Sequence, residues 1–332
     1  MPTTYDFLQR LGAVLEETHG DRRLWKAWTP TDAPLGVPHV HEICADATWH
    51  FPCAASLRHT HAWHPCTTHA AQSQRWHNAT MCLFPPHDDI ISDQIRTLGS
   101  WHDCDRLVDM WRSNTTVVRR SQHQLFIELG GNIGACSLEM LMRTDASLVV
   151  FELNPANLFR LTSTLHRLEL ERPRFRIAKR VVVFPIGVGN ESLSAQLFVA
   201  RRNHGDSIVG TAVPQQGKVR VSHTAQQTGL VRQLDAVFPT RLPTASFRLM
   251  KLDVQGFECR ALDGMRRLLQ QHAVQAIVTE VSVPHLEAQG CSANGMHDRL
   301  DELFGGKVAR PQQLRPYSWT YEASVVSSWA QG

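Results

Sequence analysis

Acidic residues stand near the carboxyl ends of four short apolar segments in this 332-residue chain: Glu128, Glu152, Asp253 and Glu280. Such segments are typical of strands buried in a sheet. Ligands of open parallel sheets bind beyond the carboxyl ends of the strands, so we expect these carboxylates to converge on one edge. A carboxylate there can bind ribose hydroxyls or remove a proton from a substrate.

A glycine turn follows the first apolar segment. Leu125 to Leu129 reads as the strand, Gly130 and Gly134 flank the turn, and Ala135 to Arg143 reads as a helix. Glycine permits positive φ and close backbone approach, and a helix N-terminus offers unpaired N–H groups and a positive dipole end. The turn suits a dinucleotide, a phosphate or the carboxylate of S-adenosylmethionine, although its spacing is not the GxGxxG of dinucleotide-binding proteins. A plain strand-to-helix turn stays an alternative.

The next two segments indicate further ligand positions. Leu148 to Leu153 carries Glu152 about 20 residues beyond the turn, where doubly wound sheets bind ribose hydroxyls. A solvated carboxylate is the alternative. A helix is predicted over Ala156 to Arg172, and the strand Val181 to Ile186 leads to Gly187, in a turn that we expect under an adenine ring.

The segment from Phe247 to Met265 is the strongest of the series. It reads as a strand with Lys251 and Asp253 near its carboxyl end, followed by a turn and a helix that begins near Phe257. This order places Asp253 and Glu258 in the same crevice as the glycine turn.

Four motifs in this order resemble the FkbM family of S-adenosylmethionine-dependent methyltransferases. The chain reads ELGGNIGACSL, FELNPANLFRL, LMKLDVQGFECRALDGM and AIVTEVSVP, and the resemblance covers roughly residues 110–305. Gln255 stands where the family usually has Glu, Leu153 where it has Pro, and Gly131 where Ala is common. The resemblance implies an α/β fold, the class I or Rossmann-like methyltransferase fold, with a doubly wound and mostly parallel sheet.

The resemblance also implies which residues bind S-adenosyl-L-methionine. The glycine turn would cradle the methionine part, and Glu152 would bind the ribose. The predicted cofactor-binding residues are Glu128, Gly130, Gly131, Asn132, Gly134, Glu152, Asn154 and Gly187.

O-methylation of a hydroxyl on a sugar, a glycan or a small molecule is the reaction that the resemblance implies. It requires an aligned hydroxyl and the removal of a proton. Asp253 is the first candidate for the base, and Lys251 and Glu258 complete the predicted catalytic set. Lys251 either orients a substrate oxygen, tunes Asp253 or forms an ordinary ion pair, and Glu258 either acts in the site or caps its own helix. The motifs predict no metal ligands.

Two other functions stay open. A binding protein that kept the fold without turnover would fit Gln255 and the unusual first third of the chain. A nicotinamide-dependent oxidoreductase is disfavoured by the spacing of Gly130 and Gly134.

Composition bounds the partners and the compartment. A formal charge of +3, from 34 basic and 31 acidic residues, gives no indication of a nucleic-acid partner or of an anionic membrane surface, and we expect no nucleic acid among the partners. There is no apolar run of 18 residues and no convincing signal peptide, which predicts a soluble chain without membrane insertion. Cytoplasm and secretory-pathway lumen both stay open, as does the oligomeric state.

Three regions are expected. Residues 1–110 form an irregular extension, a lid or acceptor-shaping element, residues 111–310 form the methyltransferase domain, and residues 311–332 form a tail packed on it. Ten of the 18 histidines lie between His39 and His102, in the extension. Helical spacing predicts two short amphipathic helices near its end, over the segment that carries Ile91, Ile95 and Leu98 and the segment that carries Leu107, Val108 and Trp111.

Cysteines and histidines of the extension allow two readings. A zinc site is one hypothesis, although the spacings match no standard finger; its candidate ligands are Cys53, His59, His61, His64, Cys66, His69 and Cys82. Disulfides in an oxidising lumen are the other. Cys136 and Cys259 are predicted as small buried thiols.

Between the third strand and the segment at Phe247, the chain is expected to form β-hairpins. Leu193 to Ala200 and Lys218 to Ser222 alternate like strands, whereas the polar run from Arg201 to Gly210 reads as an exposed loop. His204 and Asp206 in that loop are candidates for a substrate contact.

Overall fold

A computed structural model of the chain describes most of the second and final thirds and parts of the first. The described residues are 29–32, 45–49, 79–101, 103–113, 123–210, 223–237, 245–271, 274–303 and 319–324.

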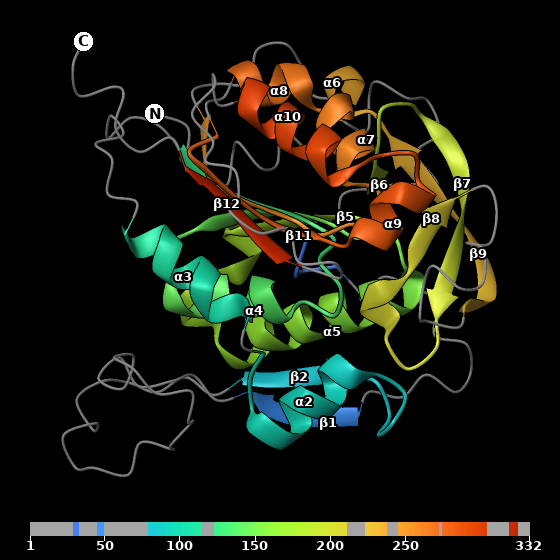
Figure 1. Ribbon diagram of the computed structural model, residues 1–332. Helices are drawn as coiled ribbons and strands as arrows, with labels where there is room; N and C mark the ends of the chain where they lie inside the picture. Colours follow the sequence, from blue (N-terminus) through green and yellow to red (C-terminus); the bar gives the residue numbers. More distant parts are fainter. Residues whose placement is uncertain are drawn as a thin grey trace.

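The central sheet has six strands, in the order β12-β11-β10-β3-β4-β5 (Figure 1). Five strands are parallel and β12 pairs antiparallel with β11. Both faces are covered, so strands such as β4 and β5 are apolar without alternation and entirely buried. The strands are β3 (His123–Leu129), β4 (Ser147–Phe151), β5 (Val181–Phe184), β10 (Ala245–Leu252), β11 (Ala276–Val281) and β12 (Trp319–Ser324).

Helices cover the two faces of this sheet (Figure 1). On one face lie α3 (Asp103–Ser113), α4 (Ala135–Arg143) and α5 (Pro155–Glu171), and on the other lie α6 (Leu234–Val237), α7 (Glu258–Gly264), α8 (Arg266–Gln271) and α10 (Ala293–Leu303). A short α9 (Val283–Ala288) follows β11. This doubly wound, mostly parallel α/β sheet confirms the predicted class I methyltransferase fold, and α4 has the predicted bounds.

A second sheet of four strands lies beside the first, in the order β6-β9-β7-β8. Its strands are β6 (Gly187–Val188), β7 (Leu193–Ala200), β8 (Ile208–Gly210) and β9 (His223–Arg232). The predicted strand over Leu193 to Ala200 is confirmed, whereas the segment Lys218 to Ser222 lies outside the described residues.

The run from Arg201 to Gly210 is not the exposed loop that its polarity predicted. It contains a 3₁₀ turn at His204–Asp206 and then β8, and its residues from Asn203 onward are at least half-buried. The reason is a pair of contacts with the extension: Ile90 N–H donates to the Arg202 carbonyl at 3.0 Å, and His204 N–H donates to Asp89 Oδ1 at 3.0 Å.

The extension packs on the helical layer of the main domain. β1 (Ala45–Trp49) and β2 (Ala79–Leu83) form an antiparallel pair, and the predicted amphipathic helices are confirmed as α2 (Ile90–Leu98) and α3. β2 lies against α5, where the Cys82 N–H donates to Thr164 Oγ1 at 3.0 Å. Ile95 is buried as predicted, but Leu98 is 48% exposed at the helix end.

Disulfides join parts of the chain that the sequence left separate. Cys104 of α3 bonds to Cys136 of α4, and Cys259 of α7 bonds to Cys291, which follows α9. Cys136 and Cys259 are buried as predicted, but they are disulfide-bonded and not free thiols, because the fold brings each one next to a partner in space. Cys82 is also disulfide-bonded.

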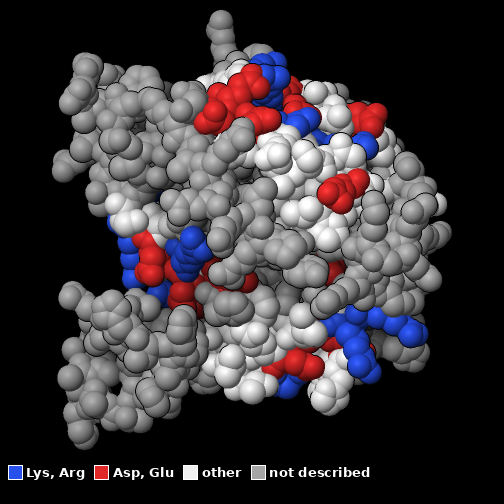
Figure 2. Space-filling model, viewed as in Figure 1, with Lys and Arg blue, Asp and Glu red and all other residues white. Residues whose placement is uncertain are grey.

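Most candidate ligands of the zinc hypothesis lie outside the described residues. Cys82 is the one candidate ligand that lies within them. Among the residues that are described, no group of three or more metal-ligating side chains comes together. Within the same ranges, every helix falls short of the length and apolarity that a bilayer span requires. Figure 2 shows acidic and basic side chains next to one another on the viewed face.

Candidate functional site

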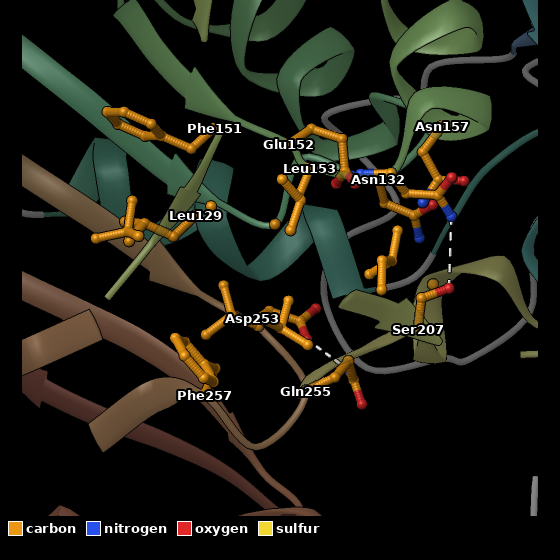
Figure 3. A pocket seen from close by; sticks show the side chains of 18 of the residues that line it. Leu129, Asn132, Phe151, Glu152, Leu153, Asn157, Ser207, Asp253, Gln255 and Phe257 are labelled. Atoms are coloured by element: carbon orange, nitrogen blue, oxygen red, sulfur yellow. Dashed lines mark hydrogen bonds between the residues drawn. The ribbon is translucent and has the colours of Figure 1, made fainter. Parts of the chain in front are cut away.

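A pocket opens where the carboxyl ends of β3, β4 and β10 meet the second sheet (Figure 3). The open space of this pocket is about 650 Å³ when the solvent-filled mouth is included. The lining residues are Leu129, Gly130, Asn132, Phe151, Glu152, Leu153, Asn154, Asn157, Ile186, Gly187, Val188, Leu197, His204, Gly205, Ser207, Val209, Val231, Asp253, Val254, Gln255 and Phe257.

The pocket has an apolar end and a polar end. In Figure 3, Leu129, Phe151 and Phe257 lie at one end, and Asn157 and Ser207 lie at the other. Glu152 and Asp253 line the space between them. A ligand with an apolar ring and a hydroxyl-bearing part would match this division.

Glu152 ties the end of β4 to the turn after β3. Its Oε2 accepts the Asn132 N–H at 2.7 Å, and its Oε1 accepts the Asn154 N–H at 2.7 Å. Burial raises the pKa of Glu152, and the backbone N–H groups of Asn154, Asn132 and Leu153 oppose that shift by stabilising the carboxylate. A carboxylate has about four acceptor positions. The residue can therefore organise the turn and still accept a hydroxyl group.

Asn154 has a further local role. Its side chain caps α5 by accepting the Ala156 N–H at 3.0 Å, and Pro155 occupies the first helical position, where its fixed φ suits a helix start.

The glycines of the turn are required by packing. A Cβ at Gly130 would overlap the Asp253 carbonyl oxygen, and one at Gly131 would lie 2.5 Å from Val150 Cγ1. A Cβ at Gly134 would lie 2.5 Å from Leu161 Cδ1, and its φ of +88° is unfavourable for other residues. Gly130 lines the pocket, whereas Gly131 and Gly134 are not among its lining residues.

Lys251 is the cation at the carboxyl edge. Its Nζ lies 2.9 Å from Asp253 Oδ2 and 3.9 Å from Glu128 Oε1. Burial alone would lower the pKa of Lys251, but the charges of Asp253, Glu128 and Glu280 raise it above the ordinary value. Three acidic strand ends thus surround one ammonium group, and the ion-pair reading of Lys251 matches this geometry.

Glu128 lies beneath the turn and does not line the pocket. It is 1% exposed and accepts a short hydrogen bond from Ser137 Oγ of α4. Burial raises the pKa of Glu128 to about 7, against the opposing effects of Lys251 and Ser137.

Asp253 lines the pocket and has both carboxylate oxygens held. Lys251 binds Oδ2, and Gln255 Nε2 donates to Oδ1 at 2.7 Å. The same Gln255 nitrogen donates to Glu280 Oε2 at 3.3 Å. The backbone of Gln255 has a φ of +50°. An amide at this position can donate to both carboxylates, whereas the family's usual Glu would add a third negative charge.

Glu258 is buried behind the pocket wall. It is 2% exposed, and its Oε1 accepts the Val254 N–H at 3.0 Å, so it braces the turn before α7. Burial raises the pKa of Glu258 to about 8. Its contacts match the capping alternative more closely than a role in the pocket.

Residues from the second sheet complete the pocket, and the motifs did not indicate most of them. Asn157, which α5 contributes, lies within the segment FELNPANLFRL, and its position at the start of a helix was the available signal. His204 was named as a candidate and lines the pocket. Asp206 does not line it, but burial, reinforced by Glu280 and Asp253, raises its pKa to about 7.

The sequence profile of the Methyltransferase FkbM domain matches residues 128–311, more than half of the chain. The chain belongs to this family. The match contains all the predicted site residues. No curated protein matches the chain.

Solved structures share low identity with this FkbM-domain protein. It is 11% identical to the small RNA methyltransferase HEN1, covering 68% of this chain and 25% of that one, with a TM-score of 0.31. It is 10% identical to the METTL16 methyltransferase domain, covering 74% of each chain, with a TM-score of 0.32. It is 13% identical to precorrin-6y C5,15-methyltransferase from Geobacter metallireducens, covering 66% of this chain and 84% of that one, with a TM-score of 0.27. The FkbM-domain protein thus spans a quarter of the length of HEN1.

Proposed function

We propose that the protein transfers a methyl group from S-adenosyl-L-methionine to a hydroxyl of a sugar, a glycan or a small molecule. The observation that carries this proposal is one pocket that joins the glycine turn, Glu152 and Asp253. Family membership supports methyl transfer in general, and the pocket residues supply the reasons for this cofactor and this reaction.

The pocket residues fit the parts of the cofactor. Ile186, Val188 and Phe257 offer apolar surface for an adenine ring, above the short strand that begins at Gly187. Glu152 has two oxygens with lone pairs to accept ribose hydroxyls. We assign the methionine part to the turn at Gly130 and Asn132, with Glu128, Gly131 and Gly134 supporting the turn from behind.

We assign the removal of the hydroxyl proton to Asp253. S-adenosyl-L-methionine, when bound, supplies an electrophilic methyl group. Asp253 reaches the pocket with a carboxylate that Lys251 and Gln255 hold from two sides, which fixes its orientation toward a hydroxyl. General-base catalysis of this kind contributes about 10²–10⁴ in rate. Lys251 is a positioning residue in this scheme, and Glu258 shapes the turn that carries Gln255.

The disulfides extend this proposal to the compartment in which the enzyme works. Disulfides persist in oxidising environments and are rare in the cytosol. The pairs Cys104–Cys136 and Cys259–Cys291 therefore favour a secretory-pathway lumen or the cell exterior for the working enzyme.

Isothermal titration of the folded protein with S-adenosylmethionine and S-adenosylhomocysteine tests the cofactor. We expect binding of both, no binding of NADH, and loss of at least tenfold in affinity for Glu152→Ala, because hydrogen bonds to charged groups each contribute about 1.5–3 kcal/mol. Glu171→Ala, exposed at the far end of α5, is the matched control and should bind normally. Undiminished affinity in Glu152→Ala would refute the ribose assignment, and tight NADH binding would replace the proposed reaction.

A further inference from the structure

We propose that Asn157 and His204 form a hydroxyl-binding subsite for the methyl acceptor, and that Phe84 of the N-terminal extension positions His204. This inference rests on the proposed function, because it gives the polar end of the pocket to the acceptor.

Two polar atoms at this end are buried without a hydrogen-bond partner in the described structure: Asn157 Oδ1 and His204 Nδ1. Both residues line the pocket, and Asn157 is only 2% exposed. Buried polar atoms in folded proteins nearly always have a partner. A ligand in the pocket is positioned to supply the missing hydrogen bonds.

The orientation of Asn157 is fixed by its own contact. Its Nδ2 donates to the His204 carbonyl oxygen at 3.3 Å. An amide that uses its nitrogen in this way presents its oxygen as the remaining acceptor. The group that meets Asn157 Oδ1 must therefore be a donor, such as a hydroxyl.

The His204 ring is fixed by the extension. It stacks on Phe84 with 3.9 Å between ring centroids and 11° between planes, and the Arg160 guanidinium lies 3.4 Å from the centroid of the same Phe84 ring. Burial lowers the pKa of His204, helped by Arg160 and opposed by Asp89. The neutral ring has one donor and one acceptor nitrogen, which suits a hydroxyl.

The negative charge of the pocket lining favours some hydroxyl compounds over others as the acceptor. Glu152 and Asp253 line it, and among the described residues no lysine or arginine does. Lys251 pairs with Asp253 but does not line the pocket, so an anionic acceptor would lie next to two carboxylates and contact no lysine or arginine of the lining. The subsite therefore fits a neutral molecule with two or more hydroxyl groups and disfavours a phosphate-bearing one.

The subsite lies apart from the region of the pocket that we assign to the cofactor. Asn157 lies at the opposite end of the pocket from Leu129, Phe151 and Phe257 (Figure 3). The apolar end accommodates adenine, and Glu152 between the two ends accommodates ribose. The polar end beyond Glu152 is left for the acceptor.

Saturation-transfer NMR with S-adenosylhomocysteine present tests the subsite without requiring turnover. The probes are methyl α-D-mannopyranoside as a neutral polyol, cyclohexanol as a single hydroxyl, and mannose 6-phosphate as an anion. The variants are His204→Phe, which retains a ring for the stack, Asn157→Ala, and Phe84→Leu. His87→Phe is the control, because the His87 side chain is 91% exposed in the same extension.

We expect the wild type and His87→Phe to bind the mannoside more tightly than either other probe. His204→Phe and Asn157→Ala should weaken mannoside binding at least tenfold while the affinity for S-adenosylhomocysteine changes less than twofold. Phe84→Leu should weaken mannoside binding similarly and also shift the ring-proton resonances of His204, a signature of the lost stack.

Three results would overturn the inference. Mannoside binding that is unchanged in His204→Phe would remove the subsite, and so would the absence of mannoside binding in wild type that binds S-adenosylhomocysteine. A tenfold loss of S-adenosylhomocysteine affinity in His204→Phe would assign the residue to the cofactor. Failure of the wild type to bind S-adenosylhomocysteine is a separate outcome, and it would overturn the proposed function as well.

Discussion

Lys251 and Asp253 form a largely buried ion pair, with 2.9 Å between Nζ and Oδ2. The pair lies at the carboxyl edge of β10, and Lys251 also approaches Glu128 of the neighbouring β3. One ammonium group thus offsets carboxylates from two adjacent strands.

Removing that ammonium should destabilise the protein. Lys251→Met leaves buried carboxylates without their cation, and breaking a buried pair from one side costs about 3–5 kcal/mol. Urea denaturation measures the loss. The double variant Lys251→Met/Glu128→Gln should recover part of it, because it removes one of the uncompensated charges. An unchanged unfolding midpoint in the single variant would contradict this account.

Stability should fall as pH rises from about 4.5 to 8. Burial raises the pKa of Glu258 to about 8, so the folded chain retains a proton that the unfolded chain releases near 4.5. The unfolded state then binds fewer protons across this window, and the free energy of unfolding decreases with pH. Glu128 and Asp206, each with a pKa raised to about 7, act in the same direction.

Urea midpoints between pH 5 and pH 8 measure this dependence. Glu258→Gln retains an acceptor for the Val254 N–H and cannot ionise, so it should flatten the slope, whereas the exposed control Glu171→Gln should retain it. Equal slopes in all three proteins would show that Glu258 is not the group that titrates.

The disulfide between Cys104 and Cys136 should contribute to stability through the link it makes between α3 and α4. Its loop spans 32 residues, and such cross-links typically contribute about 2–4 kcal/mol. Thermal unfolding of Cys104→Ser/Cys136→Ser without reductant should show a lower midpoint than the wild type. Reductant should then lower the wild-type midpoint further than that of the variant, and an equal effect on both proteins would exclude this disulfide as the cause.

Two glycines allow the cost of a steric overlap to be compared with the cost of an unfavourable backbone conformation. A Cβ at Gly264 would overlap the Gly189 carbonyl oxygen, whereas a Cβ at Gly290 would meet nothing within 4 Å. Gly290 has a φ of +77°, so Gly290→Ala should cost about 1–2 kcal/mol. Gly264→Ala should cost more, because backbone must move. Chemical denaturation measures the free energy of unfolding of both variants. A larger loss in Gly290→Ala than in Gly264→Ala would contradict the packing argument.

The fold was predictable because its signals are local. Apolar strands, the glycine turn and the helix over Ala135–Arg143 follow from short-range patterns, and the four motifs fixed their order. Disulfide pairing was not predictable, since it depends on how α3 meets α4 and how α7 meets the end of α9. The burial of residues 203–210 depends on Asp89 and Ile90, more than 100 residues away, and no local pattern reports such a contact.

The residues of the candidate site were also predictable only in part. Asp253 and Glu152 could be named from strand ends, and both line the pocket. Gly131 and Gly134 were named for ligand approach, but their packing against Val150 and Leu161 explains them without a ligand. Asn157 was missed because one polar residue at a helix start resembles an ordinary solvent-exposed position.

The pairing of β3 with β10 also affects how the chain is made. Their register joins His123 to Ala245, about 120 positions later in the sequence. At synthesis rates of about 5–20 residues per second, β3 leaves the ribosome roughly 6 to 25 seconds before its central partner exists. During that interval β3 has β4 on one side and an unpaired apolar edge on the other, which is a template for aggregation. The edge of β3 that pairs with β10 therefore stays open to other chains until β10 has been synthesised.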